Sequence, residues 1–343
     1  MRWNGLRLSL TLLTVIPLRA AAPEASPGLQ ASAAPRAGDS SADPAWPKPD
    51  PATAAAAMAW APVVGLLLGV IAAVVLLTTD RPLGAGPLTG AALAVASLAL
   101  LSRGLHLDGL ADLADGLGSG RPAPIALEIM RRSDIGPFGT VALILALLIQ
   151  VASVSHAEAS GPGRGAAALI TAVVTGRLAL TWACRQGVPA ARPDGLGALV
   201  AGTVPLAIPV ALTLAGVTAA AAAVVISTTL TGEPLGWTLP LAVVAGLAAA
   251  FVVQRQSVRR LGGITGDVLG ALAEVATTVA VVVATMGPRA LPSPVVTAGN
   301  GRRYAGRRPL APRRRHPPSA AAQGTSSLSG RRPGGSSGRP GAG

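Results

Sequence analysis

The sequence predicts an all-α, polytopic integral membrane helix bundle of about seven spans, with a short cytoplasmic helix pair that carries an acidic motif. Three observations support this fold class. Half of the residues are hydrophobic, only 13% are charged and 2% are aromatic, and the mean hydropathy is +0.54. Apolar segments of about 20 residues, the length that crosses a bilayer, recur along the chain. Turn signals rich in Gly, Pro and Asp separate these segments.

The expected spans can be bounded from hydropathy and turn signals. In chain order they cover residues 58–79, 83–102, 136–157, 166–184, 198–228, 237–254 and 264–286. The segment 198–228 is too long for one simple crossing and contains Pro205 and Pro209, so it is either one broken span or two. The count is therefore seven, plus or minus one.

Composition divides the chain into four parts. Residues 1–20 form an N-terminal hydrophobic segment that also has the pattern of a signal peptide. Residues 21–54 form an Ala/Pro-rich insertion without periodicity, which predicts disorder. Residues 55–286 form the membrane domain that carries the candidate catalytic motifs. Residues 287–343 form an Arg-rich, disordered tail.

Charge and cysteine usage exclude several classes of site. The net charge is +13, but the tail holds eleven Arg and no Asp or Glu, so the remainder is close to neutral at +2. The tail has no aromatic stacking pattern that would indicate specific nucleic-acid binding, although it could attract anionic lipid. Cys184 is the only cysteine, which excludes a disulfide framework and a cysteine-based zinc site.

The segment 103–120 carries the densest acidic pattern. On a helix, Asp108, Asp112 and Asp115 lie within about 60° of one another, and leucines occupy the opposite face. The stripe contains no Lys or Arg, so its mutual repulsion favours a bound cation over an ordinary solvated face. Oxygen ligands alone favour Mg²⁺ or Mn²⁺, and the usual partner of such a metal is a phosphate.

A second polar motif, EIMRRSDIGPFG, spans residues 128–139. Arg131 and Arg132 form a paired cationic site suited to a diphosphate, although a plain basic flank of a membrane span is the alternative. Asp134 could join the metal ligands. Gly136 and Gly139 flank Pro137 and predict the point at which the chain re-enters the membrane.

A third motif, RLGGITGDVLGALAE, combines glycines with carboxylates at residues 260–274. Gly262, Gly263 and Gly266 would let the backbone approach a ligand closely. Asp267 and Glu274 share one helical face in an apolar span, where a carboxylate is costly unless it is paired or faces water.

Arg177, midway along the span 166–184, is a candidate partner for one of these carboxylates and a candidate substrate-binding residue. The alternative is a purely structural pair between Arg177 and Glu274.

Basic residues near the span ends predict the orientation. Arg residues flank the acidic stripe and follow the span 166–184, so both loops should face the cytoplasm. The same rule also places both residues 255–260 and the tail inside. These two placements agree only if the segment 264–286 enters the membrane and returns.

Taken together, the motifs HLDGLADLADG, EIMRRSDIGPFG and GGITGDVLGALAE, in this order and at these separations, resemble the signature blocks of the cobalamin synthase family, adenosylcobinamide-GDP ribazoletransferase. The opening LTLLTVIPL is similar to that family's N-terminal block, although Val15 stands where many members carry a charged residue. The resemblance covers residues 6–18 and 58–286, outside the insertion and the tail.

The resemblance implies a magnesium-dependent, multi-pass enzyme of the cell membrane that completes the nucleotide loop of cobalamin. It would join adenosylcobinamide-GDP to α-ribazole, or to α-ribazole 5′-phosphate, giving adenosylcobalamin or its 5′-phosphate, and GMP. Asp108 and Asp112 would be the first metal ligands. Arg131 and Arg132 would bind phosphate oxygens. Asp267, or one of the stripe aspartates, would accept the proton, with His106 as a further candidate.

Two rivals belong to other classes. A membrane phosphotransferase of the CDP-alcohol type also clusters aspartates, but its pattern places an Arg two residues beyond a D-G-x-x-A core, and here the core continues to Asp112. A transporter would use Asp267, Glu274 and Arg177 as a coupling site. The bilayer is the expected surrounding, no specific nucleic acid is expected, and an oligomer is compatible with the sequence.

Overall fold

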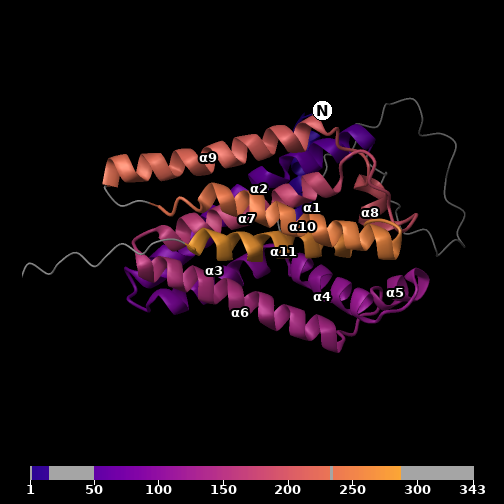
Figure 1. Ribbon diagram of the computed structural model, residues 1–343, viewed down its shortest axis with the longest axis horizontal. Helices are drawn as coiled ribbons and strands as arrows, with labels where there is room; N and C mark the ends of the chain where they lie inside the picture. The colour runs from indigo at the N-terminus through magenta and orange to yellow at the C-terminus, as the bar shows by residue number, and fades with distance from the viewer. Residues whose placement is uncertain (1, 15–49, 232–234, 287–343) are drawn as a thin grey trace, which may run out of the picture. The chain divides into compact units, whose positions relative to one another are not determined.

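The computed structural model describes residues 2–14, 50–231 and 235–286, all within one compact unit, Met1–Ser293. These residues form eleven helices and no strand, which confirms the predicted all-α class. In chain order the helices are α1 (Arg2–Leu13), α2 (Pro51–Asp80), α3 (Pro87–Leu101), α4 (Leu105–Gly118), α5 (Ala123–Ile129), α6 (Pro137–Ser160), α7 (Arg164–Ala183), α8 (Gly195–Val200), α9 (Ala207–Thr231), α10 (Leu239–Leu261) and α11 (Gly266–Thr285) (Figure 1).

Six helices, namely α2, α6, α7, α9, α10 and α11, are long and apolar enough to cross a bilayer. The sequence predicted a seventh span over residues 83–102. The structure shortens it to α3, which has 15 residues and reaches the length of a span only together with α4, at a bend of 87°. Arg103 and Gly104 make this bend with φ values of 55° and 68°. The described chain thus has six candidate spans, or seven with the bent pair, within the predicted range.

The predicted break inside residues 198–228 is present. α8 ends at Val200, Val204 pairs with Arg185 in an isolated bridge, and α9 begins at Ala207. Pro209 lies in the first turn of α9, where a missing N–H costs nothing because it would have no partner inside the helix. The segment therefore makes one crossing after an irregular loop.

Small residues hold the centre of the bundle together. A Cβ on Gly65 of α2 would lie 3.0 Å from the backbone oxygen of Val173 in α7. A Cβ on Gly176 of α7 would lie 2.7 Å from the backbone oxygen of Ala273 in α11. In a bilayer the hydrophobic effect does not drive helices together, because the lipid tails are as apolar as the side chains. Van der Waals contact between closely packed backbones is therefore a main source of stabilisation. The helices α2, α7 and α11 consequently form a tight core.

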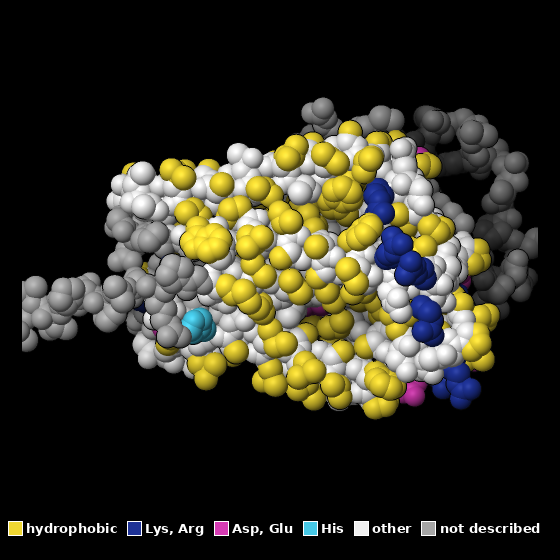
Figure 2. Space-filling model, in the orientation of Figure 1, with side chains coloured by type: hydrophobic (Ala, Val, Ile, Leu, Met, Phe, Trp, Pro, Cys, Tyr) yellow, Lys and Arg dark blue, Asp and Glu magenta, His cyan; other side chains and the backbone are white. Residues whose placement is uncertain are grey.

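The two ends of the bundle differ in charge. α4, α5 and α8 gather at one end, where Figure 2 shows a row of Lys and Arg side chains beyond a largely hydrophobic face. At the far end of α2 and α6, Arg81 pairs with the buried Glu158 at 2.8 Å. α11 runs without a break between the two ends, so a last segment that enters and returns is not seen in the described chain.

The predicted domain boundaries are only partly within the described residues. α2 begins at Pro51, capped by Asp50, whose carboxylate accepts a 2.8 Å bond from the backbone N–H of Thr53. Helix α2 therefore begins four residues before position 55, where the membrane domain is expected to start. Residues 15–49 of the predicted leader and insertion, and the predicted tail 287–343, lie outside the described residues.

Candidate active site

A cavity of about 310 Å³ lies where α4, the loop after α7 and the start of α11 meet. Its apolar wall comes from α1, α2 and α7, and its polar lining comes from the motifs singled out in the sequence and from the loop 192–195. The polar side chains in the lining are His106, Asp108, Arg192, Asp194, Thr265 and Asp267. A cavity with apolar walls and a few convergent charged groups is the expected form of a small-molecule site.

Backbone contact between α4 and α11 creates this cluster. A Cβ on Gly109 would lie 2.6 Å from the backbone oxygen of Asp267, and a Cβ on Gly270 would lie 3.0 Å from that of Leu105. Any larger residue would push the two helices apart. The glycine next to Asp108 therefore brings the acidic stripe beside Asp267, more than 150 residues further along the chain.

The carboxylates concentrate negative charge. Burial, followed by the charges of Asp108, Asp267 and Asp115, raises the pKa of Asp112 to about 7, and the nearby Arg192 opposes this shift only in part. The raised pKa means that these carboxylates repel one another strongly enough to retain a proton near neutral pH. A bound cation would relieve the same repulsion.

Arg192 is a residue that sequence reasoning did not assign to the site. Its Nη1 lies 3.7 Å from Oδ2 of Asp267, and its Nη2 donates to the backbone oxygen of Leu127 in α5. Its Nε is buried and has no hydrogen-bond partner. The signal in the sequence was the run Arg192 to Gly195, RPDG, in which an arginine, an aspartate and a glycine follow a span. A basic flank of a span has the same appearance, so the signal was ambiguous.

Arg131 reaches the same region from the end of α5. Its Nη2 donates to both carboxylate oxygens of Asp194, at 3.0 and 3.1 Å. Asp194 lines the cavity, and both side chains of the pair are more than half exposed. The second predicted arginine, Arg132, is exposed, as is Asp134. The structure describes no side-chain bond for either of them, so only Arg131 of this motif is tied to the site.

Asp115 has a different environment from the other two aspartates of the stripe. It is buried, and its two oxygens accept bonds from the backbone N–H groups of Gly136, at 2.7 Å, and Gly139, at 2.9 Å. A Cβ at either glycine would lie 2.4 Å from an Asp115 oxygen. Asp115 thus fixes the start of α6 against α4, at the predicted re-entry point.

The three glycines of the turn before α11 have different structural roles. Gly262 ends α10 with φ of 85°, and a Cβ on Gly263 would lie 2.5 Å from the backbone of residues 189–191. Backbone bonds join Ile264 to that loop on both sides. Gly262 and Gly263 therefore hold the loop that carries Arg192, while Gly266 lines the cavity itself.

His106 lies in the cavity wall with its ring buried. Its Nδ1 has no hydrogen-bond partner. Burial, helped by the charge of Arg177, holds the pKa of His106 well below its usual value, so the imidazole is neutral at physiological pH. The same lowered pKa makes this imidazole a weaker proton acceptor than an ordinary histidine.

Arg177 does not line this cavity. It lies buried in α7 and lines a separate small cavity of about 10 Å³ together with Glu274 and Gln150. Gln150 donates a 2.9 Å bond to Glu274. Because Arg177 and Glu274 share this enclosed space within the bundle, the arrangement favours the structural alternative for the pair over a substrate contact.

The donor set fits a magnesium ion in its chemistry. No three His, Cys, Asp or Glu side chains of the described chain converge closely enough to form a ready-made metal cage. Mg²⁺ does not need one, because it keeps several waters and usually takes one or two carboxylates together with substrate phosphates. Asp108 and Asp112, with Asp267 opposite, supply oxygen ligands of that kind.

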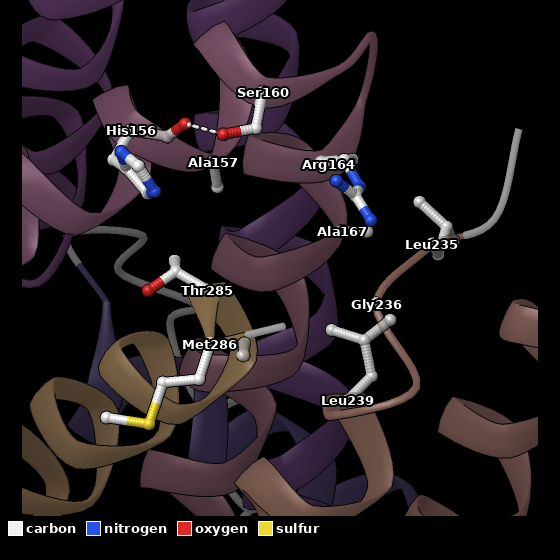
Figure 3. A pocket seen from close by; sticks show the side chains of 11 residues that line it. His156, Ala157, Ser160, Arg164, Ala167, Leu235, Gly236, Leu239, Thr285 and Met286 are labelled. Atoms are coloured by element: carbon white, nitrogen blue, oxygen red, sulfur yellow. Dashed lines mark hydrogen bonds between the residues drawn. The ribbon is translucent and has the colours of Figure 1, made fainter. Parts of the chain in front are cut away.

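A second cavity, at the far end of the bundle, is a poor candidate. It holds about 30 Å³, room for only a few water molecules. Figure 3 shows His156, Ser160 and Arg164 around it, with Ser160 donating to the backbone oxygen of His156. No carboxylate lines it.

Comparison with known proteins agrees with the motif resemblance. The family Cobalamin-5-phosphate synthase matches residues 5–285. A protein of Frankia casuarinae named adenosylcobinamide-GDP ribazoletransferase is 40% identical over 298 residues, covering 84% of this chain and 96% of the relative. Proteins of the same name from a Nocardioides species, 39% identical over 65% of this chain and 84% of the relative, and from Rhizobium etli, 38% identical over 62% and 79%, are also similar. No solved structure matches the chain. The chain therefore belongs to the cobalamin-5-phosphate synthase family, a family of membrane transferases.

Proposed function

We propose that this protein catalyses the Mg²⁺-dependent reaction of adenosylcobinamide-GDP with α-ribazole, or with α-ribazole 5′-phosphate. A hydroxyl of the ribazole attacks the phosphorus on the cobinamide side of the diphosphate. The new P–O bond forms as the bond to the GMP oxygen breaks, giving adenosylcobalamin or its 5′-phosphate, and GMP. Family membership supports this transfer over a CDP-alcohol phosphotransferase and over a transporter.

The observation that carries the proposal is the meeting of Asp108, Asp267 and Arg192 in one cavity. Asp112 lies close enough to interact electrostatically with both aspartates, and Arg131 pairs with Asp194 of the cavity lining. Arginines and a divalent ion neutralise the negative charge of a diphosphate ester. More negative charge develops on the GMP oxygen as its bond to phosphorus breaks, so the same groups stabilise the transition state. This cavity combines carboxylates with an arginine beside a glycine-lined backbone.

Each side chain has a role in this scheme. Asp108 and Asp112 hold the metal, which supplies Lewis-acid polarisation of the diphosphate oxygens when bound. Arg192 and Arg131 hold the phosphate oxygens, because a guanidinium donates two parallel bonds to such a group. Asp267 accepts the proton of the attacking hydroxyl, and the neutral His106 is the alternative acceptor.

The active site faces the cytoplasm in this proposal. Arg121, Arg131 and Arg185 lie in loops, and Arg255 and Arg259 lie in the last two turns of α10. An excess of Arg near span ends marks the cytoplasmic side of a membrane protein. The orientation can be checked by labelling a single cysteine introduced in the 119–122 loop of intact cells, in a Cys184→Ala background.

The test is GMP release by membranes that contain the protein, assayed with adenosylcobinamide-GDP and either ribazole substrate. We expect activity that EDTA abolishes and Mg²⁺ restores. Asp112→Asn should lower the rate at least about a hundredfold, the size of effect seen when one group that stabilises transition-state charge is removed. Asp80→Asn, the same change at the far end of α2, is the matched control. Undiminished, Mg²⁺-dependent GMP release by Asp112→Asn would remove the metal-site proposal.

A further inference from the structure

We propose that a groove along α7 and α10, outside the catalytic cavity, binds an anionic phospholipid. Two adjoining cavities form the groove, and they share Phe251 and Gln254. One holds about 230 Å³, lies between α7, α10 and α11, and is lined almost entirely by apolar side chains. The other holds about 300 Å³ and lies between the loop 185–189 and the last turns of α10. Neither shares a residue with the catalytic cavity.

The second cavity is strongly basic. Arg185, Arg255 and Arg259 line it, and no Asp or Glu lines either part of the groove. None of these three arginines forms an ion pair with a described residue. Basic pockets between membrane helices, close to a membrane surface, are the sites that recognise phospholipid headgroups.

Arg185 is held in position before any ligand binds. Its guanidinium stacks over Trp182, 6.0 Å from the ring centre, and over Phe251, 5.6 Å from the ring centre. Its Nη1 donates to the backbone oxygen of Trp182 at 3.0 Å and to the side-chain oxygen of Gln254 at 2.9 Å. Gln254 is itself fixed, because its amide donates to the backbone oxygen of Ala183. Both described bonds of Arg185 use one nitrogen, so the rest of the guanidinium can donate to a phosphate.

The arrangement of the two halves selects a lipid over a soluble phosphate. The apolar half lies deeper along α10, beside Leu247 and Ala248, and the arginines lie at the helix end. Phe251 is 48% exposed on the outer side of a predicted span, where acyl chains would surround it. A phosphate with an attached acyl chain fills both halves, whereas a free phosphate would leave the apolar half empty.

The test is native mass spectrometry of the full chain in detergent, titrated with dioleoyl phosphatidylglycerol or with dioleoyl phosphatidylcholine. We expect phosphatidylglycerol to bind more tightly. Arg255→Gln with Arg259→Gln should weaken that binding about thirty-fold, since each arginine near an anionic lipid contributes roughly a fivefold factor. Arg7→Gln with Arg121→Gln removes the same charge from exposed positions outside the groove and should leave the affinity unchanged. Equal affinity for the two lipids, or equal loss in both double variants, would overturn the proposal.

A second variant tests the acyl-chain half. Ala248→Phe fills that cavity from the exposed side of α10 and should weaken dioleoyl phosphatidylglycerol without changing the binding of glycerol 3-phosphate. If glycerol 3-phosphate binds the wild type as tightly as the lipid does, the groove is a soluble-phosphate site and the proposal is wrong. GMP release by each variant reports that the catalytic cavity is intact, so failure here is distinguishable from failure of the proposed reaction.

Discussion

Replacing Asp115 should mainly lower the free energy of unfolding, because this side chain has a structural role. Its two oxygens accept the backbone N–H groups of Gly136 and Gly139 at the start of α6, and the side chain is 8% exposed. These N–H groups belong to the first turn of a helix and have no partner within it. Asp115 therefore acts as a remote cap that ties α6 to α4.

The magnitude follows from the two bonds. Asp115→Ala leaves two N–H groups without an acceptor, and a buried unsatisfied donor costs about 1–3 kcal/mol. The expected loss is about 2–6 kcal/mol in the free energy of unfolding. Asp115→Asn keeps one acceptor oxygen and should lose about half as much.

The assay is unfolding of the purified protein in mild detergent, followed by circular dichroism. Asp134→Ala, an exposed change in the neighbouring loop, should stay within about 0.5 kcal/mol of wild type. Wild-type stability in Asp115→Ala would refute the capping role. Unchanged stability together with lost divalent-ion binding would instead identify Asp115 as a metal ligand.

Three further predictions concern the site. Gly109→Ala should abolish most GMP release without altering any charge, because its Cβ would lie 2.6 Å from the Asp267 backbone oxygen; cross-linking between α4 and α11 should report the displacement. Arg192→Lys should impair the enzyme nearly as much as Arg192→Gln, mainly in kcat, because a lysine keeps the charge and loses the paired donors; full activity of the lysine variant would argue against phosphate binding. The Mg²⁺ concentration for half-maximal activity should rise as the pH falls below about 7, because the raised pKa of Asp112 lets protons compete with the metal; a requirement that is constant from pH 6 to 8 would contradict this.

The helices could be predicted from the sequence because hydropathy and helix length act locally. The segments 136–157 and 166–184 correspond closely to α6 and α7, and the Pro137 boundary is confirmed. The segment 83–102 ends as predicted, but its helix begins only at Pro87, because residues 81–86 form the turn after α2, and the remaining 15 residues are short for a span. The bend after it depends on the unusual backbone of Arg103, which no pattern of apolar residues reveals.

The site was predictable only in part. The acidic stripe and Asp267 could be found because charged groups stand out in apolar surroundings. Their meeting depends on Gly109 and Gly270, whose packing joins distant segments and leaves no periodic signal. Arg192 was missed for the same reason, since its approach to Asp267 arises from the turn at Gly263. The sequence pattern also did not separate Asp115 from Asp112, because the burial of Asp115 and its two bonds to the start of α6 arise from the packing of α6 against α4.

The most direct test is to measure Mn²⁺ binding by electron paramagnetic resonance in the presence of adenosylcobinamide-GDP. It asks whether the carboxylates of α4 and α11 form a single site that binds both the cation and the diphosphate. Wild type should bind the ion, and the substrate should tighten that binding. Asp108→Asn and Asp112→Asn should each weaken it at least about tenfold, while Asp80→Asn should not. Substrate-dependent Mn²⁺ binding that survives both site variants unchanged would contradict this account of the active site.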